Sequence, residues 1–141
     1  MSACLLGVPC RYDGAGKPCA AAVELLKHHQ VIPVCPEQLG GLCTPRLPAE
    51  IVGEEVMRKD GIPVTEAYQR GAEETAKLCR LFGCDAAVLK SRSPSCGSFT
   101  IYDGTFSGQL IPGQGVTAKK ITELGIPVTD EEHLERISSI V

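Results

Sequence analysis

The sequence has no tryptophan and few aromatic residues, which make up 4% of its 141 residues. Proteins that bind single-stranded nucleic acids stack bases on aromatic side chains, so this scarcity argues against such a platform. Basic residues are not in excess either, because the formal net charge is −3. Binders of nucleic-acid polymers usually carry a basic stripe. The composition therefore favours a small molecule over a nucleic acid as the partner.

Long apolar runs are also lacking. None approaches the roughly 20 residues that a membrane-spanning helix needs, and no basic and apolar leader pattern opens the sequence. We therefore expect a cytoplasmic protein that makes no membrane contact. Internal repeats and linkers are absent from the sequence as well, and its length suits one core. Residues 1–141 are predicted to form a single domain.

Cysteine, in contrast, is abundant. No Cys-x-x-Cys pair occurs, which excludes the usual zinc ribbon and the thioredoxin-type redox motif. A disulfide framework is typical of shorter secreted chains and is not expected here. The remaining interpretations are ligation of a metal or cluster, thiol catalysis, or small buried hydrophobic side chains. The eight cysteines are Cys4, Cys10, Cys19, Cys35, Cys43, Cys79, Cys84 and Cys96.

Short apolar runs alternate with helical patterns along the chain. A long helix is predicted to begin near Thr65 and to end at Gly83, and residues 36–50 are rich in proline and glycine, which predicts a loop. The alternation indicates an α/β fold, a three-layer α/β/α domain with a mostly parallel, Rossmann-like sheet. Strands are predicted over residues 2–6, 31–35, 86–90 and 126–128, and helices over 18–29, 66–82 with Thr65 as the cap, 115–124 and 129–140.

Three cysteines stand at or just after predicted strands: Cys4, Cys35 and Cys96. Ligands of open α/β sheets bind beyond the carboxyl ends of the strands, so we expect these three thiols to meet at one edge. The other cysteines follow no such rule. Those in or near helices are expected to be packed or surface thiols, and those in loops near the same edge have an open role. The first group is Cys19, Cys79 and Cys84, and the second is Cys10 and Cys43.

The residue types around this trio restrict its chemistry. Catalytic zinc usually takes at least one histidine or carboxylate among its ligands, and none of the histidines, His28, His29 and His133, is predicted near this edge. Three soft thiolates with an open fourth position suit an iron–sulfur cluster better. Burial of the three cysteines as small hydrophobic side chains is the alternative.

Five ordered motifs extend this interpretation. They are SACLLG with RYDG, VCPEQLGGLCTPRLPAEI, AVLKSRSPSCGS, YDGTFSG and GQGVTA. Together they resemble the thiouracil desulfurase family over nearly the whole chain. The resemblance implies a [4Fe–4S] cluster on Cys4, Cys35 and Cys96, and an enzyme that removes sulfur from thiolated uracil bases or nucleotides and releases hydrogen sulfide.

Two residues beside these cysteines have the chemistry that such a hydrolysis needs. Attack by water on a thiocarbonyl carbon needs a base, and Glu37 is the carboxylate nearest to Cys35 in sequence. A loop carboxylate paired with Arg46 is the alternative for Glu37. Protonation of the sulfur or of a ring nitrogen requires a proton donor, such as the hydroxyl of a short side chain, and we select Ser93 for that role. A turn-forming role is the alternative for Ser93.

Substrate contacts are predicted at Arg11, Lys90 and Ser95. Either basic residue is able to hold the phosphate of a nucleotide, and solvated surface charge is the alternative for both.

Two rival functions also remain. One is a cluster-free sulfur transferase that carries a persulfide on Cys96, favoured by the nearby Lys90 and Arg92. The other is a non-catalytic module that holds a metal or cluster for a partner.

Overall fold

A computed structural model describes residues 1–140 of the chain. Its centre is a set of parallel backbone segments, of which β3 (Ala87–Val88) and β6 (Val128–Thr129) form a regular pair. Hydrogen bonds extend this pair, since the Ser2 N–H donates to the Val88 carbonyl at 2.9 Å and Ser2 bridges Val34 in parallel. The segments around Val34, Ser2, Val88 and Val128 therefore lie side by side in that order, as a doubly wound α/β fold requires.

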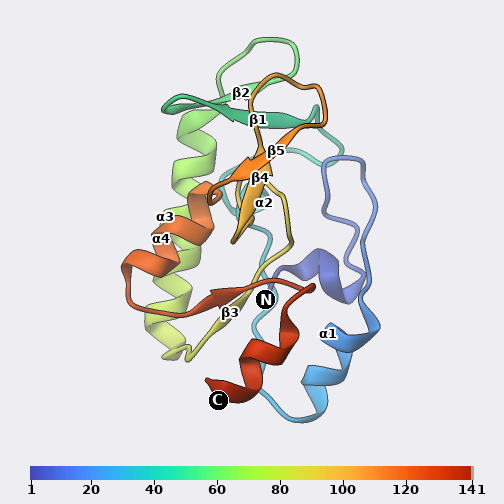
Figure 1. The fold of residues 1–141 in the computed structure, drawn as a ribbon, viewed down its shortest axis with the longest axis vertical. Coiled ribbons are helices and arrows are strands. Elements are labelled where there is room, and N and C mark those ends of the chain that lie inside the picture. Colours follow the sequence, from blue (N-terminus) through green and yellow to red (C-terminus); the bar gives the residue numbers. More distant parts are fainter. Residues whose placement is uncertain (141) are drawn as a thin grey trace.

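Helices and turns cover both faces of these segments (Figure 1). Ala87 and Leu89 pack with Cys79 and Ile121, which belong to α3 (Thr65–Phe82) and α4 (Val116–Glu123). Val88 points the other way, because side chains alternate along a strand. It joins a second core cluster from the N-terminal turns and the C-terminal segment, namely Ala3, Cys4, Leu5, Cys10, Ala22 and Ile137. The predicted three-layer α/β/α class is confirmed, although its sheet is small.

The predicted helices are confirmed with shorter or tighter geometry at both ends of the chain. The first is α1 (Ala20–Glu24), continued by the 3₁₀ turn η2 (Leu25–Lys27), and the last is the 3₁₀ helix η3 (Leu134–Ser139). The predicted first strand is wrong beyond Ser2, because the chain turns there into the 3₁₀ helix η1 (Ala3–Leu6). α3 begins one residue earlier than predicted, because Thr65 is its first residue rather than its cap, and it ends as predicted at Gly83 in the left-handed conformation, which glycine adopts without a steric cost.

Two antiparallel hairpins stand apart from the parallel segments. β1 (Ala49–Val52) pairs with β2 (Glu55–Arg58), and β4 (Thr100–Tyr102) pairs with β5 (Leu110–Pro112). The sequence analysis did not predict them. The predicted loop over residues 36–50 is partly wrong, because it contains α2 (Pro36–Leu39) and the start of β1. Among the described helices, none has the length and apolar character that crossing a bilayer requires.

α2 and α3 pack without side chains between them. A methyl group added at Gly71 would overlap the Pro36 carbonyl, and one added at Gly40 would overlap the Ala67 carbonyl. The Gly40 N–H also donates to the Pro36 carbonyl at 2.9 Å. This close contact fixes the first turn of α2, and therefore the residues on either side of Pro36, against the longest helix of the fold.

We expect Gly71→Ala to lower the free energy of unfolding by about 1–3 kcal/mol, the usual cost of overpacking a close contact. Alanine favours a helix interior more than glycine does, so a loss rather than a gain of stability reports the contact with α2. Urea denaturation measures the change, with Lys77→Ala on the exposed face of α3 as the control. An equal or higher stability of Gly71→Ala would contradict this packing.

Candidate active site

A cavity of about 510 Å³ lies where the central segments end at their carboxyl side. Four cysteines line it, namely Cys4, Cys10, Cys35 and Cys96. Cys4, Cys35 and Cys96 each follow a different segment of the parallel set, and Cys10 lies in the first loop. Cys4 and Cys96, which are 92 positions apart in sequence, therefore line the same cavity wall. The three cysteines expected to meet at this edge therefore do so, and Cys10 joins them.

Local structure explains the position of each of the three. Cys4 lies in η1, directly after the backbone pairs of the first segment. Cys35 is the extended residue before α2, and Pro36 begins that helix with a pre-set backbone angle. Cys96 lies in the loop after β3, where its N–H donates to the Ser93 hydroxyl at 3.0 Å. The Ser2 hydroxyl donates to the Cys96 sulfur at 3.4 Å and ties this loop to the first segment.

Three of the four thiols, those of Cys4, Cys10 and Cys96, are buried, and that of Cys35 is half-buried. Burial raises the pKa of Cys4 to about 12, and the nearby Cys96 and Cys10 raise it further. Burial raises the pKa of Cys96 to about 11, against a lowering by the Ser2 hydroxyl. The pKa of Cys10 rises to about 12 for the same first reason, with Cys35 as the next cause. The sulfur atoms thus form one electrostatic group.

This donor set consists of sulfur alone. Soft thiolates select soft or iron–sulfur centres over magnesium or calcium, and binding such a centre displaces the thiol protons. Within residues 1–140, no three cysteine, histidine or acidic side chains gather around one point as ligands of a single ion. An iron–sulfur cluster takes one thiolate at each of several irons, and the chemistry of these sulfur donors fits such a centre.

Glu37 lies in the first turn of α2, and its carboxylate lines the same cavity. The Tyr68 hydroxyl donates to Oε1 of Glu37. Arg46 donates from Nη2 to Oε2 at 3.1 Å. The ion pair with Arg46, which the sequence analysis gave as the alternative interpretation, is therefore present, and it lies at the cavity rather than in a remote loop.

The predicted serines differ in their positions. Ser93 lines the cavity, and its oxygen accepts the N–H groups of Ser95 and Cys96, both at 3.0 Å. Its hydroxyl proton is free of these bonds, because a hydroxyl has two acceptor lone pairs and one donor. Ser95 is 1% exposed, bonds the Thr117 hydroxyl at 2.8 Å, and is not part of the cavity wall. Its predicted substrate contact is not supported by this position.

The predicted basic residues both line the cavity and both have acidic partners. Lys90 forms an ion pair with Glu131 at 2.9 Å and donates to the Ser91 hydroxyl. Arg11 lies 3.6 Å from Asp13 in a more exposed pair. Pairing with Glu131 offsets much of the positive charge of Lys90, so Arg11 is the more available of the two for an anion.

Sequence reasoning missed Tyr68 as a site residue. It lies within the correctly predicted helix α3, 31 positions from Glu37, and is 3% exposed. A tyrosine on the inner face of a helix is normally interpreted as a core residue, and no local sequence motif indicates a catalytic role for it. The position of its hydroxyl in the cavity wall marks Tyr68 as a site residue, and that position is visible only in the folded structure.

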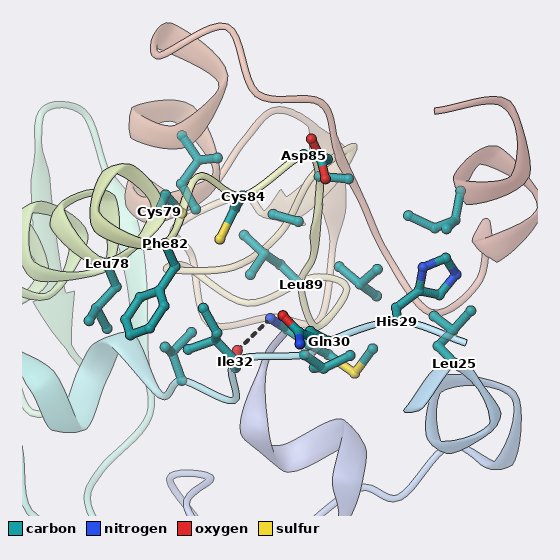
Figure 2. Close-up of a pocket in the computed structure, with 18 of the residues that line it drawn as sticks. Leu25, His29, Gln30, Ile32, Leu78, Cys79, Phe82, Cys84, Asp85 and Leu89 are labelled. Carbon is teal, nitrogen blue, oxygen red and sulfur yellow. Dashed lines mark hydrogen bonds between the residues drawn. The ribbon is translucent and has the colours of Figure 1, made fainter. Parts of the chain in front are cut away.

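The helix cysteines lie elsewhere, as expected. Cys79 and Cys84 line a second cavity of about 560 Å³, near the amino ends of the parallel segments (Figure 2). Leu78 and Phe82 flank it on the α3 side, and Ile32 lies across from them (Figure 2). Cys79 and Cys84 therefore do not share the wall formed by Cys4, Cys35 and Cys96.

An α/β domain with a sulfur-lined cavity at its strand ends is the class that fold and site define. Within that class, a profile described as 2-thiouracil desulfurase matches residues 1–133. The chain is 43% identical to a solved [4Fe–4S]-dependent thiouracil desulfidase, TudS, with a TM-score of 0.92 over 97% of this chain and 92% of that one. It is 40% identical to the uncharacterized protein YbbK of Bacillus subtilis (strain 168), over 97% of both chains. The chain belongs to the 2-thiouracil desulfurase family.

Proposed function

We propose that this protein is a desulfidase that converts the thiocarbonyl of a thiolated uracil compound to a carbonyl and releases hydrogen sulfide. The family match and the likeness to a [4Fe–4S]-dependent thiouracil desulfidase bear out the desulfidase activity and the iron–sulfur cofactor expected from the sequence. The observation that carries the proposal is the wall of thiols beside a carboxylate and a free hydroxyl.

Cys4, Cys35 and Cys96 would hold the cluster in this proposal. A cluster held by three protein ligands supplies an iron that acts as a Lewis acid with affinity for sulfur. Cys10 stands in the same wall without an assigned role. Its carbonyl accepts the Cys35 thiol at a sulfur-to-oxygen distance of 3.6 Å, so the loop that carries Cys10 also positions Cys35.

The chain's own residues supply the proton transfers. Glu37 takes a proton from a water molecule, whose oxygen forms a bond to the thiocarbonyl carbon. Ser93 donates a proton toward the sulfur or a ring nitrogen as the carbon–sulfur bond breaks. The proton held by Glu37 and the proton of the newly added oxygen then complete hydrogen sulfide and restore the Ser93 hydroxyl. The sum is a thiocarbonyl plus water giving a carbonyl plus hydrogen sulfide, so atoms balance and no electron is transferred. Glu37 therefore acts as general base and Ser93 as the proton donor.

The persulfide alternative receives less support from the site. A nucleophilic cysteine is typically exposed in part and has a lowered pKa. Cys96 is 5% exposed, and burial raises its pKa to about 11. Lys90, which was expected to favour the Cys96 thiolate, pairs with Glu131 instead. Both facts argue against a nucleophilic role for the free Cys96 thiol.

A small thiolated pyrimidine is the proposed substrate, with 4-thiouridine monophosphate as the form we favour and nucleotide salvage in the cytoplasm as the setting. The cavity volume of about 510 Å³ lies in the usual range for small-molecule sites. Arg11, Lys17 and Lys59 line it and are able to attract a phosphate.

We expect faster desulfuration of 4-thiouridine monophosphate than of thiolated tRNA by the same protein, because the acidic chain offers a polymer no basic stripe. Sulfide release from each substrate at equal thiobase concentration measures this directly, and the preferred reaction is expected to depend only weakly on salt. Faster reaction of the tRNA would contradict the assignment of a small substrate.

A further inference from the structure

The carboxylate of Glu37 is held at both of its oxygens by residues from two other parts of the chain. Tyr68 of α3 donates its hydroxyl to Oε1, and Arg46 donates to Oε2 at 3.1 Å. All three side chains are largely withdrawn from solvent, with exposures of 8% for the Arg46 side chain and 17% for that of Glu37. Hydrogen bonds to a charged group in such surroundings are stronger than those on an open surface.

Arg46 is itself immobilised by further bonds. Its Nη2 donates to the Cys10 carbonyl at 2.9 Å, and its Nη1 donates to the Cys43 carbonyl at 3.1 Å and the Thr44 hydroxyl at 2.9 Å. The Cys10 carbonyl also accepts the Cys35 thiol. Arg46 thus joins the loop of Cys10, its own loop and the first turn of α2 into one unit.

Tyr68 is fixed for a different reason. It lies on α3, three residues before Gly71, where the backbone of α2 contacts α3 with no side chain between them. The relative position of the two helices therefore determines where the tyrosine hydroxyl meets Glu37. A carboxylate bound from both sides has lost most of its rotational freedom, while each oxygen keeps a second lone pair that is able to accept a proton.

We propose that Tyr68 and Arg46 are positioning residues, which aim the carboxylate of Glu37 at the attacking water. This inference rests on the proposed function, because it concerns the group named there as general base. Neither residue needs to contact substrate for this role. The two hydrogen bonds fix the orientation of the carboxylate, so that a free lone pair of a Glu37 oxygen points toward the water molecule. Correct orientation of a catalytic group contributes a large factor to the reaction rate.

Tyr68→Phe tests the role with the smallest change. We expect kcat to fall about 10- to 100-fold, the scale of loss when a catalytic group is misplaced by about an ångström. KM and iron content should stay near the wild-type values, because the change removes one oxygen atom, which is bonded to Glu37, and leaves the thiols and the basic residues of the cavity untouched. Thr75→Val is the matched control. It removes another buried hydroxyl from α3, one that bonds the Gly71 carbonyl and lies outside this cavity, and its kcat should match that of the wild type.

Combination with Glu37→Gln separates positioning from a general structural effect. If Tyr68 acts through Glu37, the double variant should turn over at the rate of Glu37→Gln alone, because the group that the tyrosine aims is already disabled. The same Tyr68→Phe loss in both backgrounds, or no loss in the wild-type background, would overturn the positioning role. A wild-type protein that carries its full cluster but releases no sulfide would instead overturn the proposed function, and the positioning role with it.

Discussion

Replacement of Cys96 by alanine is expected to leave a folded protein that holds no iron–sulfur cluster. The same result is expected for Cys4→Ala and Cys35→Ala, because a cluster with three protein ligands is left with two. Binding of such centres depends on every thiolate of the set, so iron content should fall to background rather than by a fraction. Iron and sulfide analysis after anaerobic reconstitution measures this outcome.

Cys79→Ala is the matched control for that experiment. Cys79 is about as buried as Cys4 and Cys96 and packs in the same core cluster as Cys96, yet it lines the other cavity. Its replacement removes the same atoms from a similar environment, and cluster content should stay normal. Cys84→Ala should behave alike. An empty site in Cys10→Ala together with a full one in Cys4→Ala would contradict the ligand assignment.

Glu37→Gln should lower turnover by about 10²- to 10⁴-fold, the usual contribution of a general base. The carboxamide has nearly the shape of the carboxylate and lacks the charge that takes a proton from water. Single-turnover sulfide release, with iron content measured on the same sample, reports the effect. The structure adds a second consequence, because an amide offers one acceptor oxygen to two donors, Tyr68 and Arg46. One of these bonds is therefore lost as well.

The iron content decides how that result is interpreted. Normal iron with low turnover supports a base at Glu37. Loss of iron from Glu37→Gln would show that the residue supports the ligands, since it stands two positions after Cys35. Full activity would show that water is activated elsewhere, and Ser93 would then be the better candidate.

The parts of the fold that were predictable are those in which local signals agree. α3 combines a long amphipathic pattern with a terminal glycine; its end was predicted correctly and its start to within one residue. The meeting of Cys4, Cys35 and Cys96 in one wall followed from a rule about strand ends that needs only the order of elements. That rule held even though the chain leaves the first segment directly after Ser2.

Other features depended on contacts that no local pattern encodes. The hairpins β1–β2 and β4–β5 use short, partly exposed strands, and the composition of their surroundings is that of a loop. Ser95 lies beside Cys96 in the chain, yet the tight loop turns its side chain toward Thr117 in α4. The partners of Glu37 are separated from it by 9 and 31 positions. Nearness in sequence found a carboxylate that lines the cavity, but not the residues that bind it.

The central claim is that three thiols of one wall hold a cluster that serves a hydrolytic desulfuration. The most direct measurement is sulfide release from 4-thiouridine monophosphate by the anaerobically reconstituted protein, with no reductant or oxidant present. We predict about four irons per chain, the content of one [4Fe–4S] cluster, and one sulfide released for each carbonyl product formed over many turnovers. Equal activity of the iron-free protein, or a reaction that stops unless an electron donor or acceptor is supplied, would contradict it.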